Sequence, residues 1–417
     1  MKESRYKEQL EYCLQCKNKP CQKACPLEND IPSVIDYMKK QDDQKAYSIL
    51  EKTTVLSSVC GRICPQKRQC EGSCTRGINS IPVCIGQIEA YLGDKFLEQS
   101  FSMISNDLVG KKIAVVGSGP AGLTCSAFLA RHGAKVSLYE KQEKLGGLLC
   151  YGIPNFRLDS KIVQKNIHKI LKLGITPYCN FSLKTKEQLT KLQEQYDAVF
   201  LAIGANCSVK MGLQGENLQG VYGGNELLQT NHHPNYIRKK VVIIGGGNVA
   251  IDVARTIKKL GAKEVLILYR RTKRQMPAEQ KEIEAAEKEG IILKEEYMVT
   301  KILGKEGKVT KIEYCQTKQQ EGIPLLLEQT KKERKVDYVV MAIGSKPEKE
   351  IIMNLGLATN EKGYLVLDKE YQTSKERVFA AGDLIGTKST VAWAARSGRE
   401  AANYIKEYLL RKDLLYR

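Results

Sequence analysis

The sequence has little tryptophan and histidine and no long apolar run. Its 417 residues include one tryptophan and four histidines. His132, His168, His232 and His233 have no spacing typical of metal ligands or of a catalytic triad. No apolar segment is long enough to cross a bilayer, and the first residues lack the pattern of a secretory signal peptide. We therefore expect a cytoplasmic protein without a membrane segment.

Acidic residues are fewer than basic ones, 47 against 66, and the formal net charge is +19. Most of this excess lies beyond the first hundred residues. The chain has no basic patch interleaved with aromatic residues and no recognisable nucleic-acid module, so nucleic acid is not an expected partner. We expect the excess basic residues to bind phosphate-rich cofactors and to face an acidic surface of a partner protein.

The cysteines lack the spacing that zinc prefers. Nine of the fourteen fall before residue 85, in two blocks and one outlier: Cys13, Cys16, Cys21 and Cys25; Cys60, Cys64, Cys70 and Cys74; and Cys84. Neither block holds two C-x2-C pairs, and both contain Cys-Pro, as ferredoxins do. No signal indicates an oxidising compartment, which argues against disulfides. The spacing favours iron–sulfur clusters, with zinc and reduced structural cysteines as alternatives.

Between and after these blocks the chain has helical periodicity, over residues 31–56 and 85–96. Pro32 suits the first turn of a helix. The sequence predicts a small helical domain over residues 1–105, with too little core to be stable without its inorganic groups. Residues 99–110 are expected to be a linker.

Residues 111–141 follow the order strand, glycine-rich loop, helix, strand. Residues 113–116 form a β-branched run, and the glycines after it have G-x-G-x-x-G spacing. Such glycines permit a tight turn, the close approach of a pyrophosphate and the close packing of the helix. The acidic Glu140 at the end of the second strand suits hydrogen bonds to a ribose diol. The loop residues expected to contact a dinucleotide are Gly117, Gly119, Pro120, Ala121 and Gly122.

Residues 238–271 repeat this plan. The loop residues of the second copy are Gly245, Gly247, Asn248, Val249 and Ala250. The apolar segments 196–206 and 336–347 also match each other, and Ala342 and Gly344 in the second are candidate cofactor contacts. The duplication predicts an α/β fold with two Rossmann-like, doubly wound nucleotide-binding domains, one inserted in the other and both preceded by the helical domain. The predicted boundaries are 106–222 with 336–417 for the first, and 223–335 for the second.

The two copies differ in charge at the end of the second strand. The first ends in Glu140, whereas the second ends in Arg270 and Arg271, followed by Lys273 and Arg274. A carboxylate suits a free ribose diol, and guanidinium groups suit a 2′-phosphate. The first domain is therefore predicted to bind FAD and the second NADPH. The alternative is that the basic residues form a solvated turn.

A reactive C-x-x-C near the nucleotide loops, which a disulfide reductase would need, is absent. The later cysteines are solitary: Cys125, Cys150, Cys179, Cys207 and Cys315. Hydride transfer depends on proximity and stacking more than on acid–base residues, so no catalytic residue is nominated. An iron–sulfur module that binds nucleotides without turnover remains an alternative.

Several motifs together resemble those of a known family. They are CLQCKNKPCQKACP, VCGRICPQKRQCEGSCTRG, VVGSGPAGL, GGLLCYGIPNFRL, YRRTKRQMPA and FAAGDL. The chain resembles the small (beta) subunit of bacterial glutamate synthase and the N-terminal flavin and iron–sulfur part of dihydropyrimidine dehydrogenase, over nearly its whole length. The resemblance implies two 4Fe-4S clusters, FAD and NADPH.

The resemblance also implies the cluster ligands. One cluster would be held by Cys13, Cys16, Cys21 and Cys74, and the other by Cys25, Cys64, Cys70 and Glu89. The dehydrogenase has a glutamine where this chain has Glu89, which is a departure in residue type. Cys84 is close enough in sequence to compete with Glu89, and Cys60 has no implied role.

The further FAD contacts implied are Glu140, Gly147, Leu148, Arg157, Gly382 and Asp383. An acidic residue after Ala-Gly at a strand end, such as Asp383, can bind a ribityl hydroxyl. The helix from about residue 390 would point its N-terminus at the flavin.

A flavin converts two-electron into one-electron chemistry, and clusters without a catalytic pocket serve as electron carriers. The resemblance implies an NADPH-dependent oxidoreductase subunit in a hetero-oligomer, passing electrons through FAD and two clusters to a large catalytic subunit. The favoured partner is the FMN-containing glutamate synthase large subunit, which makes glutamate from glutamine and 2-oxoglutarate. The alternatives are a pyrimidine-reducing subunit and another ferredoxin-linked acceptor.

Overall fold

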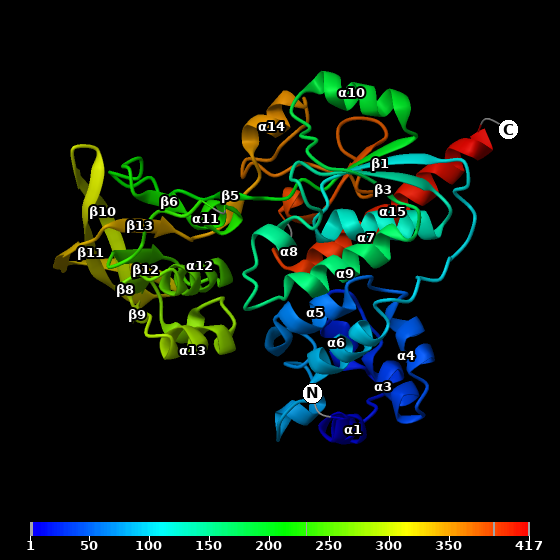
Figure 1. Cartoon of the computed structure of the whole chain (residues 1–417), viewed down its shortest axis with the longest axis horizontal. Coiled ribbons are helices and arrows are strands. Elements are labelled where there is room, and N and C mark those ends of the chain that lie inside the picture. Colours follow the sequence, from blue (N-terminus) through cyan, green and yellow to red (C-terminus); the bar gives the residue numbers. More distant parts are fainter. Residues whose placement is uncertain (1–2, 231, 387, 416–417) are drawn as a thin grey trace. The chain divides into compact units, whose positions relative to one another are not determined.

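The computed structural model describes residues 3–230, 232–386 and 388–415. Two compact units divide the chain. Unit 1 comprises residues 1–150, 155–205 and 347–417, and unit 2 comprises residues 151–154 and 206–346. Figure 1 shows the elements of both units, and each is described here by itself.

Unit 1 begins with a layer of short helices. They are α1 (Glu3–Tyr12), α2 (Pro20–Ala24), α3 (Ile31–Lys39), α4 (Asp43–Leu50), α5 (Ser57–Ile63) and α6 (Ile85–Lys95), with the 3-10 turns η1 (Gln66–Arg68) and η2 (Thr75–Ile78). Asp30 caps α3 by accepting a hydrogen bond from the Ser33 amide, and Pro32 lies in the first turn, where its missing N–H costs nothing. The buried core of these helices includes Val34, Ile35 and Leu92.

The rest of unit 1 is built on a five-stranded parallel sheet in the order β15-β4-β1-β2-β3. Its strands are β1 (Lys112–Val116), β2 (Lys135–Tyr139), β3 (Thr176–Tyr178), β4 (Ala198–Leu201) and β15 (Val378–Ala380). Its helices are α7 (Pro120–Arg131), α8 (Leu148–Tyr151), α9 (Ser160–Leu171), α10 (Lys186–Gln195), α14 (Lys349–Asn354) and α15 (Val391–Leu415), with η4 (Gly382–Ile385). All of β4 and all of β1 except Lys112 are buried, as expected for a parallel sheet covered on both faces.

Unit 2 contains a second five-stranded parallel sheet, in the order β6-β13-β7-β8-β9. These strands are β6 (Val221–Gly223), β7 (Lys240–Ile244), β8 (Glu264–Tyr269), β9 (Ile292–Glu295) and β13 (Tyr338–Met341). An antiparallel sheet is formed by β10 (Tyr297–Lys305), β11 (Lys308–Gln320) and β12 (Ile323–Lys335), and a small pair by β5 (Cys207–Ser208) and β14 (Ser345–Lys346). The helices are α11 (Gly224–Gln229), α12 (Asn248–Lys259) and α13 (Gln280–Lys288), with η3 (Lys273–Gln275).

The predicted fold class is confirmed, with two doubly wound domains, one inserted in the other, after a helical segment. The predicted edges of the inserted domain need correction. Residues 221–222 and 338–341 were assigned to the first domain, but β6 and β13 pair within the second sheet. The structure therefore places the edges of the insertion at 205/206 and 346/347, apart from residues 151–154, which also belong to unit 2. Residues 99–110 form no helix or strand, yet Phe101 and Leu108 within them are buried.

The helical segment is joined to the first nucleotide-binding domain by buried polar contacts inside unit 1. Lys169 of α9 is 2% exposed, and its ammonium group donates to the Tyr47 hydroxyl at 2.6 Å and the Phe96 carbonyl at 2.8 Å. Arg131 of α7 donates to the carbonyls of Glu51 and Ser102, each at 2.8 Å. Buried cations that satisfy backbone carbonyls at fixed geometry attach the segment firmly, because breaking them would leave charges unpaired.

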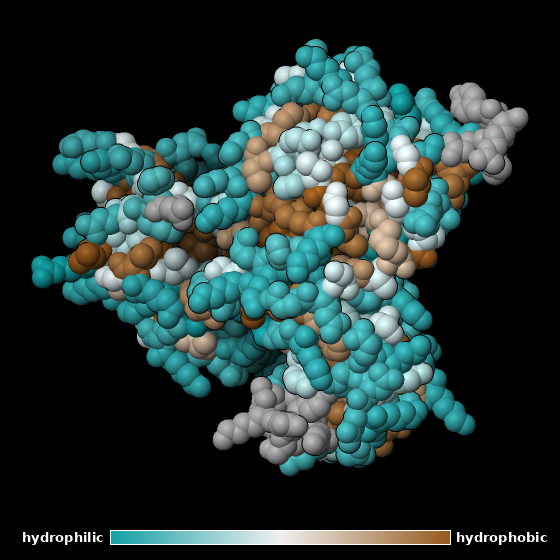
Figure 2. Space-filling model, turned by 45° about the vertical axis from the view of Figure 1, so that its right-hand side comes forward, coloured by the Kyte–Doolittle hydropathy of each residue, from teal (hydrophilic) through white to brown (hydrophobic). Residues whose placement is uncertain are grey.

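The outer surface agrees with the charged composition. Figure 2 shows hydrophilic residues over most of the face in view, with apolar residues visible in places. No helix among the described residues is both long and apolar enough to cross a membrane.

Candidate cofactor sites

The first glycine-rich loop joins β1 to α7 and has the geometry that a pyrophosphate requires. Gly117 has φ +102°, and a Cβ there would overlap the Ala202 carbonyl oxygen. A Cβ at Gly122 would overlap the Gly117 carbonyl oxygen, so α7 packs directly on the loop. At Gly119, by contrast, no atom lies within 4 Å of the place a Cβ would take. The loop therefore leaves one open approach to its backbone, in front of the start of α7 at Pro120 and Ala121.

Glu140 follows β2 and is buried beside this loop. Its carboxylate accepts hydrogen bonds from the Ser118 amide at 3.0 Å and the Gln142 amide at 2.9 Å. Ser118 Oγ in turn accepts from the Gly146 amide at 2.9 Å. Sequence reasoning missed Ser118, which the glycine pattern treats as a variable position.

The segment with Gly147 and Leu148 lies against the same loop. A Cβ at Gly147 would stand 2.9 Å from the Gly119 Cα, so the two glycine backbones are in direct contact. Arg157 lies between α8 and α9 and is partly exposed. Gly147 is thus brought to the loop, and the roles of Leu148 and Arg157 stay predictions.

Asp383 lies in η4, at the end of β15. Its Oδ1 atom is buried and has no hydrogen-bond partner among the described residues, and burial raises the pKa of the carboxyl to about 6. Gly382 has φ +75°, and its amide donates to Ser397 Oγ of α15 at 3.0 Å. An unsatisfied buried acceptor is costly unless a ligand donates to it, and a ribityl hydroxyl of FAD is a suitable donor.

The second glycine-rich loop joins β7 to α12 and repeats this geometry in unit 2. Gly245 has φ +141°, and a Cβ there would overlap the Ala342 carbonyl oxygen. The nearest atom to a Cβ at Gly247 is 3.9 Å away, so this backbone is also open. Asn248, the first residue of α12, accepts a hydrogen bond from the Glu279 amide at 3.0 Å.

The remaining residues predicted for this loop lie nearby. Val249 and Ala250 form the first turn of α12. The Ala342 amide donates to the Ile244 carbonyl at 2.8 Å, and Gly344 follows with φ +140°. The loop and the segment after β13 thus lie side by side.

The predicted arginines follow β8, next in the sheet to β7. Arg270 and Arg274 are exposed, and Arg271 is partly exposed. The Nε atom of Arg271 is buried and has no hydrogen-bond partner among the described residues. Arg270 directly follows β8 as Glu140 directly follows β2, and the binding of a 2′-phosphate by these arginines stays a prediction.

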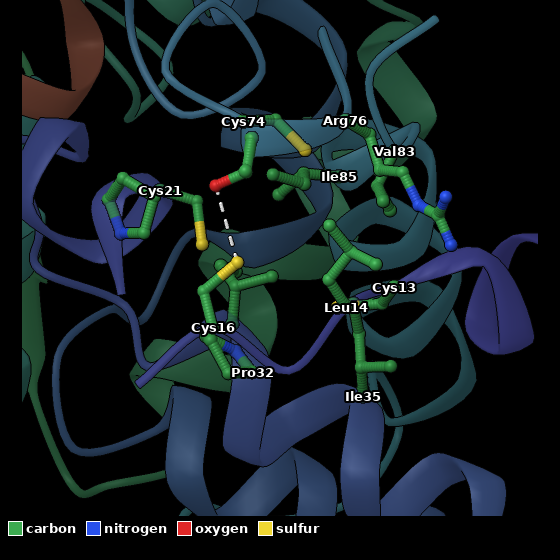
Figure 3. Close-up of a pocket in the computed structure, with 13 residues that line it drawn as sticks. Cys13, Leu14, Cys16, Cys21, Pro32, Ile35, Cys74, Arg76, Val83 and Ile85 are labelled. Atoms are coloured by element: carbon green, nitrogen blue, oxygen red, sulfur yellow. Dashed lines mark hydrogen bonds between the residues drawn. The ribbon is translucent and has the colours of Figure 1, made fainter. Parts of the chain in front are cut away.

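Four of the predicted cluster ligands line one pocket in the helical segment: Cys13, Cys16, Cys21 and Cys74. Figure 3 shows the sulfur atoms of Cys16, Cys21 and Cys74 around this pocket. Apart from the thiols the lining is mainly apolar, and Cys16 Sγ is 3.3 Å from Thr75 Oγ1. Burial raises the pKa of the Cys21 thiol to about 11. The donor set, four thiols at one apolar pocket, fits a 4Fe-4S cluster.

The other four predicted ligands form a second, more deeply buried group. Burial, with smaller contributions from the nearby Glu89 and Cys64, raises the pKa of Cys25 to about 12. Burial is also the largest cause that raises the pKa of Cys70, to which Cys25 and Glu89 contribute. Metal binding would displace protons from such thiols.

Glu89 is buried on α6 and held in one orientation. Its Oε1 atom accepts a hydrogen bond from Asn29 Nδ2 at 3.1 Å, and burial raises its pKa to about 8. Asn29 is a residue that sequence reasoning missed, because it lies 60 positions from its partner.

Two further cysteines lie near this group. Cys60 on α5 is buried, and its thiol forms a hydrogen bond with Cys64, the residue that follows α5. The Cys84 amide donates to Gln9 Oε1 at 3.0 Å, at the start of α6. Glu89 is among the groups whose charge acts on Cys25 and Cys70, and whether Glu89 or Cys84 completes the ligand set stays a prediction.

Within the described residues, no three His, Cys, Asp or Glu side chains are close enough together to bind one metal ion. A zinc ion, with Zn–S distances of about 2.3 Å, needs its ligands to converge on one point. A 4Fe-4S cluster takes one ligand for each iron, so its cysteines stand further apart.

Comparison with known proteins agrees with both kinds of site. Residues 111–400 match the family described as pyridine nucleotide-disulphide oxidoreductase, which covers well over half of the chain. The chain belongs to this family. Residues 1–101 match the family described as dihydropyrimidine dehydrogenase domain II, 4Fe-4S cluster. The protein is therefore an oxidoreductase whose cofactors are FAD, a pyridine nucleotide and 4Fe-4S iron–sulfur centres.

Relatives of this oxidoreductase are similar over nearly the full chain. The glutamate synthase [NADPH] small chain of Escherichia coli K12 is 33% identical, over 98% of this chain and 92% of the relative. That of Azospirillum brasilense is 31% identical, over 97% and 89%. The NAD-dependent dihydropyrimidine dehydrogenase subunit PreT of Salmonella typhimurium is 29% identical, over 95% and 92%. The resemblance predicted from the motifs is confirmed.

Solved structures share the fold of the nucleotide-binding part. FprA from Mycobacterium tuberculosis has a TM-score of 0.64 at 18% identity, over 73% of this chain and 86% of FprA. Thioredoxin reductase of T. acidophilum has a TM-score of 0.54 at 22% identity, over 72% and 99%.

Replacing Glu89 with alanine should leave about eight irons per chain but change the signal of one cluster, since three thiolates would still hold it. A Glu89→Gln variant keeps an oxygen ligand without the charge and should raise that cluster's reduction potential. Iron analysis and electron paramagnetic resonance (EPR) of the anaerobically reduced protein measure both effects. If both variants give the wild-type spectrum, Glu89 is not a ligand.

Proposed function

We propose that this chain takes electrons from NADPH and passes them, through bound FAD and two 4Fe-4S clusters, to a separate catalytic subunit. FAD accepts a pair of electrons and releases them singly, which is the chemistry that links a nicotinamide to iron–sulfur carriers. The observation that carries the proposal is the composition of unit 1, in which one compact body holds the first nucleotide loop and both groups of ligand residues.

The two nucleotide sites support the assignment of FAD to the first loop and NADPH to the second. Glu140 at the first loop suits the free ribose diol of FAD, and Arg270 and Arg271 at the second suit the 2′-phosphate of NADPH. The buried, unsatisfied Asp383 carboxylate next to α15 is expected to accept a hydrogen bond from the flavin side chain. None of these residues acts on the substrate of the partner.

Protein purified without oxygen should contain about one FAD and about eight irons, and NADPH should support steady reduction of an artificial dye. Binding of NADPH without turnover would instead favour a regulatory module. A colourless preparation, or one that holds zinc and no flavin, would contradict the proposal.

For the partner we propose the glutamate synthase large subunit. Three relatives that are above 30% identity and covered over 89% or more of their own length are named glutamate synthase small chains, whereas the PreT relative is 29% identical. The complex isolated from native cells should then form glutamate from glutamine and 2-oxoglutarate with NADPH. Reduction of a pyrimidine by that complex, with no glutamate formed, would assign the alternative partner.

A further inference from the structure

The helix α15 connects the predicted flavin site with the second group of cluster ligands. Near its start, Ser397 Oγ accepts the hydrogen bond from the Gly382 amide beside Asp383. One turn of the same helix also carries Arg396 and Arg399, and these side chains reach the helical segment of unit 1. A single rigid helix therefore contacts both regions.

The two arginines bind the backbone that directly follows Cys25. Arg396 Nη1 donates to the Pro26 carbonyl at 3.1 Å. Arg399 Nη1 donates to the Leu27 carbonyl at 2.9 Å and to the Thr53 carbonyl at 2.6 Å. The planar guanidinium group fixes the direction of each bond, so these contacts orient the loop that carries Cys25.

The contacts continue to the other side of the ligand group. Thr53 Oγ1 donates to Asn29 Oδ1 at 2.6 Å, and Asn29 Nδ2 donates to Glu89 Oε1 at 3.1 Å. Arg399 is therefore linked indirectly to two of the four predicted ligands, to Cys25 by the backbone at Leu27 and to Glu89 by Thr53 and Asn29.

The charges of the two arginines are compensated differently. Arg396 forms ion pairs with Glu28 at 2.9 Å and Glu400 at 2.7 Å. Arg399 forms no ion pair with a carboxylate in the described part of the chain, although Glu400, Glu28 and Cys25 act on it at longer range. Burial lowers the pKa of Arg399, but a guanidinium group keeps its proton in proteins. Arg399 is thus a partly buried positive charge beside the Cys25 loop.

We propose that Arg399 is a positioning residue that fixes Cys25 and Glu89 and raises the reduction potential of the cluster they hold. The inference rests on the proposed function, since it requires a cluster at these ligands. A cluster gains one negative charge on reduction, and a nearby cation in a medium of low dielectric constant stabilises the reduced form.

The test uses the holoprotein, purified without oxygen, and three variants. Arg399→Met removes the charge and the hydrogen bonds, whereas Arg399→Lys keeps the charge. Arg411→Met is the matched control, because Arg411 lies on the same helix and pairs with Glu370 on the surface. Iron analysis and EPR-monitored redox titration measure the occupancy and the potential of each cluster.

We expect Arg399→Met to lower the reduced-to-oxidised ratio of one cluster about tenfold at a fixed potential, which is a shift of about 59 mV. The other cluster should keep its potential. Arg399→Lys should retain most of the wild-type potential, and Arg411→Met should retain all of it.

A fully loaded Arg399→Met protein with both potentials unchanged would overturn the proposal, as would equal shifts in the Met and Lys variants. If Arg399→Met loses iron, the Lys variant decides, since iron loss there too would overturn the role of the charge. A wild-type protein without cluster signals would instead refute the proposed function.

Discussion

Replacing Arg270 and Arg271 together with alanine should lower kcat/KM for NADPH about 100-fold or more, while kcat/KM for NADH stays within about threefold. Each charge-assisted hydrogen bond to a phosphate contributes about 1.5–3 kcal/mol, so losing two costs at least about 3 kcal/mol. NADH has no 2′-phosphate and loses nothing comparable. Steady-state reduction of a dye with each nucleotide measures both constants.

Two exposed lysines elsewhere in the chain provide a control for the change in net charge. Lys305 and Lys308 are exposed lysines at the turn between β10 and β11, and replacing both with alanine also removes two positive charges. That variant should keep the wild-type preference for NADPH. Equal losses for NADPH and NADH in the arginine variant would show that these residues do not bind the 2′-phosphate. The same loss of preference in the lysine control would show that the effect is only one of net charge.

The nucleotide loops were predictable because their requirements are local. A tight turn, a close helix and an open backbone are all set within a few residues, and Gly117, Gly119 and Gly122 meet them as expected. The acidic residue after the second strand of the first copy and the basic residues at the same place in the second copy were also evident from the sequence. Local chemistry was thus enough to predict a different nucleotide for each loop.

The edges of the inserted domain were not predictable in the same way. The segments that form β4 and β13 have nearly the same apolar pattern, and pattern alone does not say which sheet a parallel strand joins. Sheet membership depends on neighbours far away in sequence. The strands at the edges of the insertion were therefore assigned to the wrong domain.

The hydrogen bonds that orient the predicted cluster ligands could not be predicted from the sequence either. Asn29 reaches Glu89 over 60 positions, and Arg399 reaches Leu27 over 372. Cys74 is the last cysteine of the second block in sequence, yet it lines the same pocket as three cysteines of the first block. The spacing of the cysteines did not predict this grouping, whereas the family resemblance implied it. The type of a residue shows whether its side chain can bind a metal. Only the fold shows which of these side chains lie together at one site.

The two open glycines allow the cofactor sites to be tested separately. Gly119 and Gly247 both have negative φ, −66° and −87°, which any residue can adopt. Neither has a close neighbour at the Cβ position, so valine at either place should leave the free energy of unfolding within about 0.5 kcal/mol of wild type. The side chain would instead occupy the space through which a pyrophosphate reaches the backbone.

We therefore expect Gly119→Val to weaken FAD binding about 100-fold and leave NADP⁺ binding unchanged, and Gly247→Val to do the reverse. Blocking the backbone removes at least one charge-assisted hydrogen bond and adds a steric clash, together about 3 kcal/mol. Flavin titration of the apoprotein and calorimetry with NADP⁺ measure the two affinities, and each variant is the control for the other. If Gly119→Val kept its flavin, the open side of the first loop would not be the pyrophosphate site. If either variant lost both nucleotides while its unfolding transition stayed unchanged, the two loops would not be separate sites.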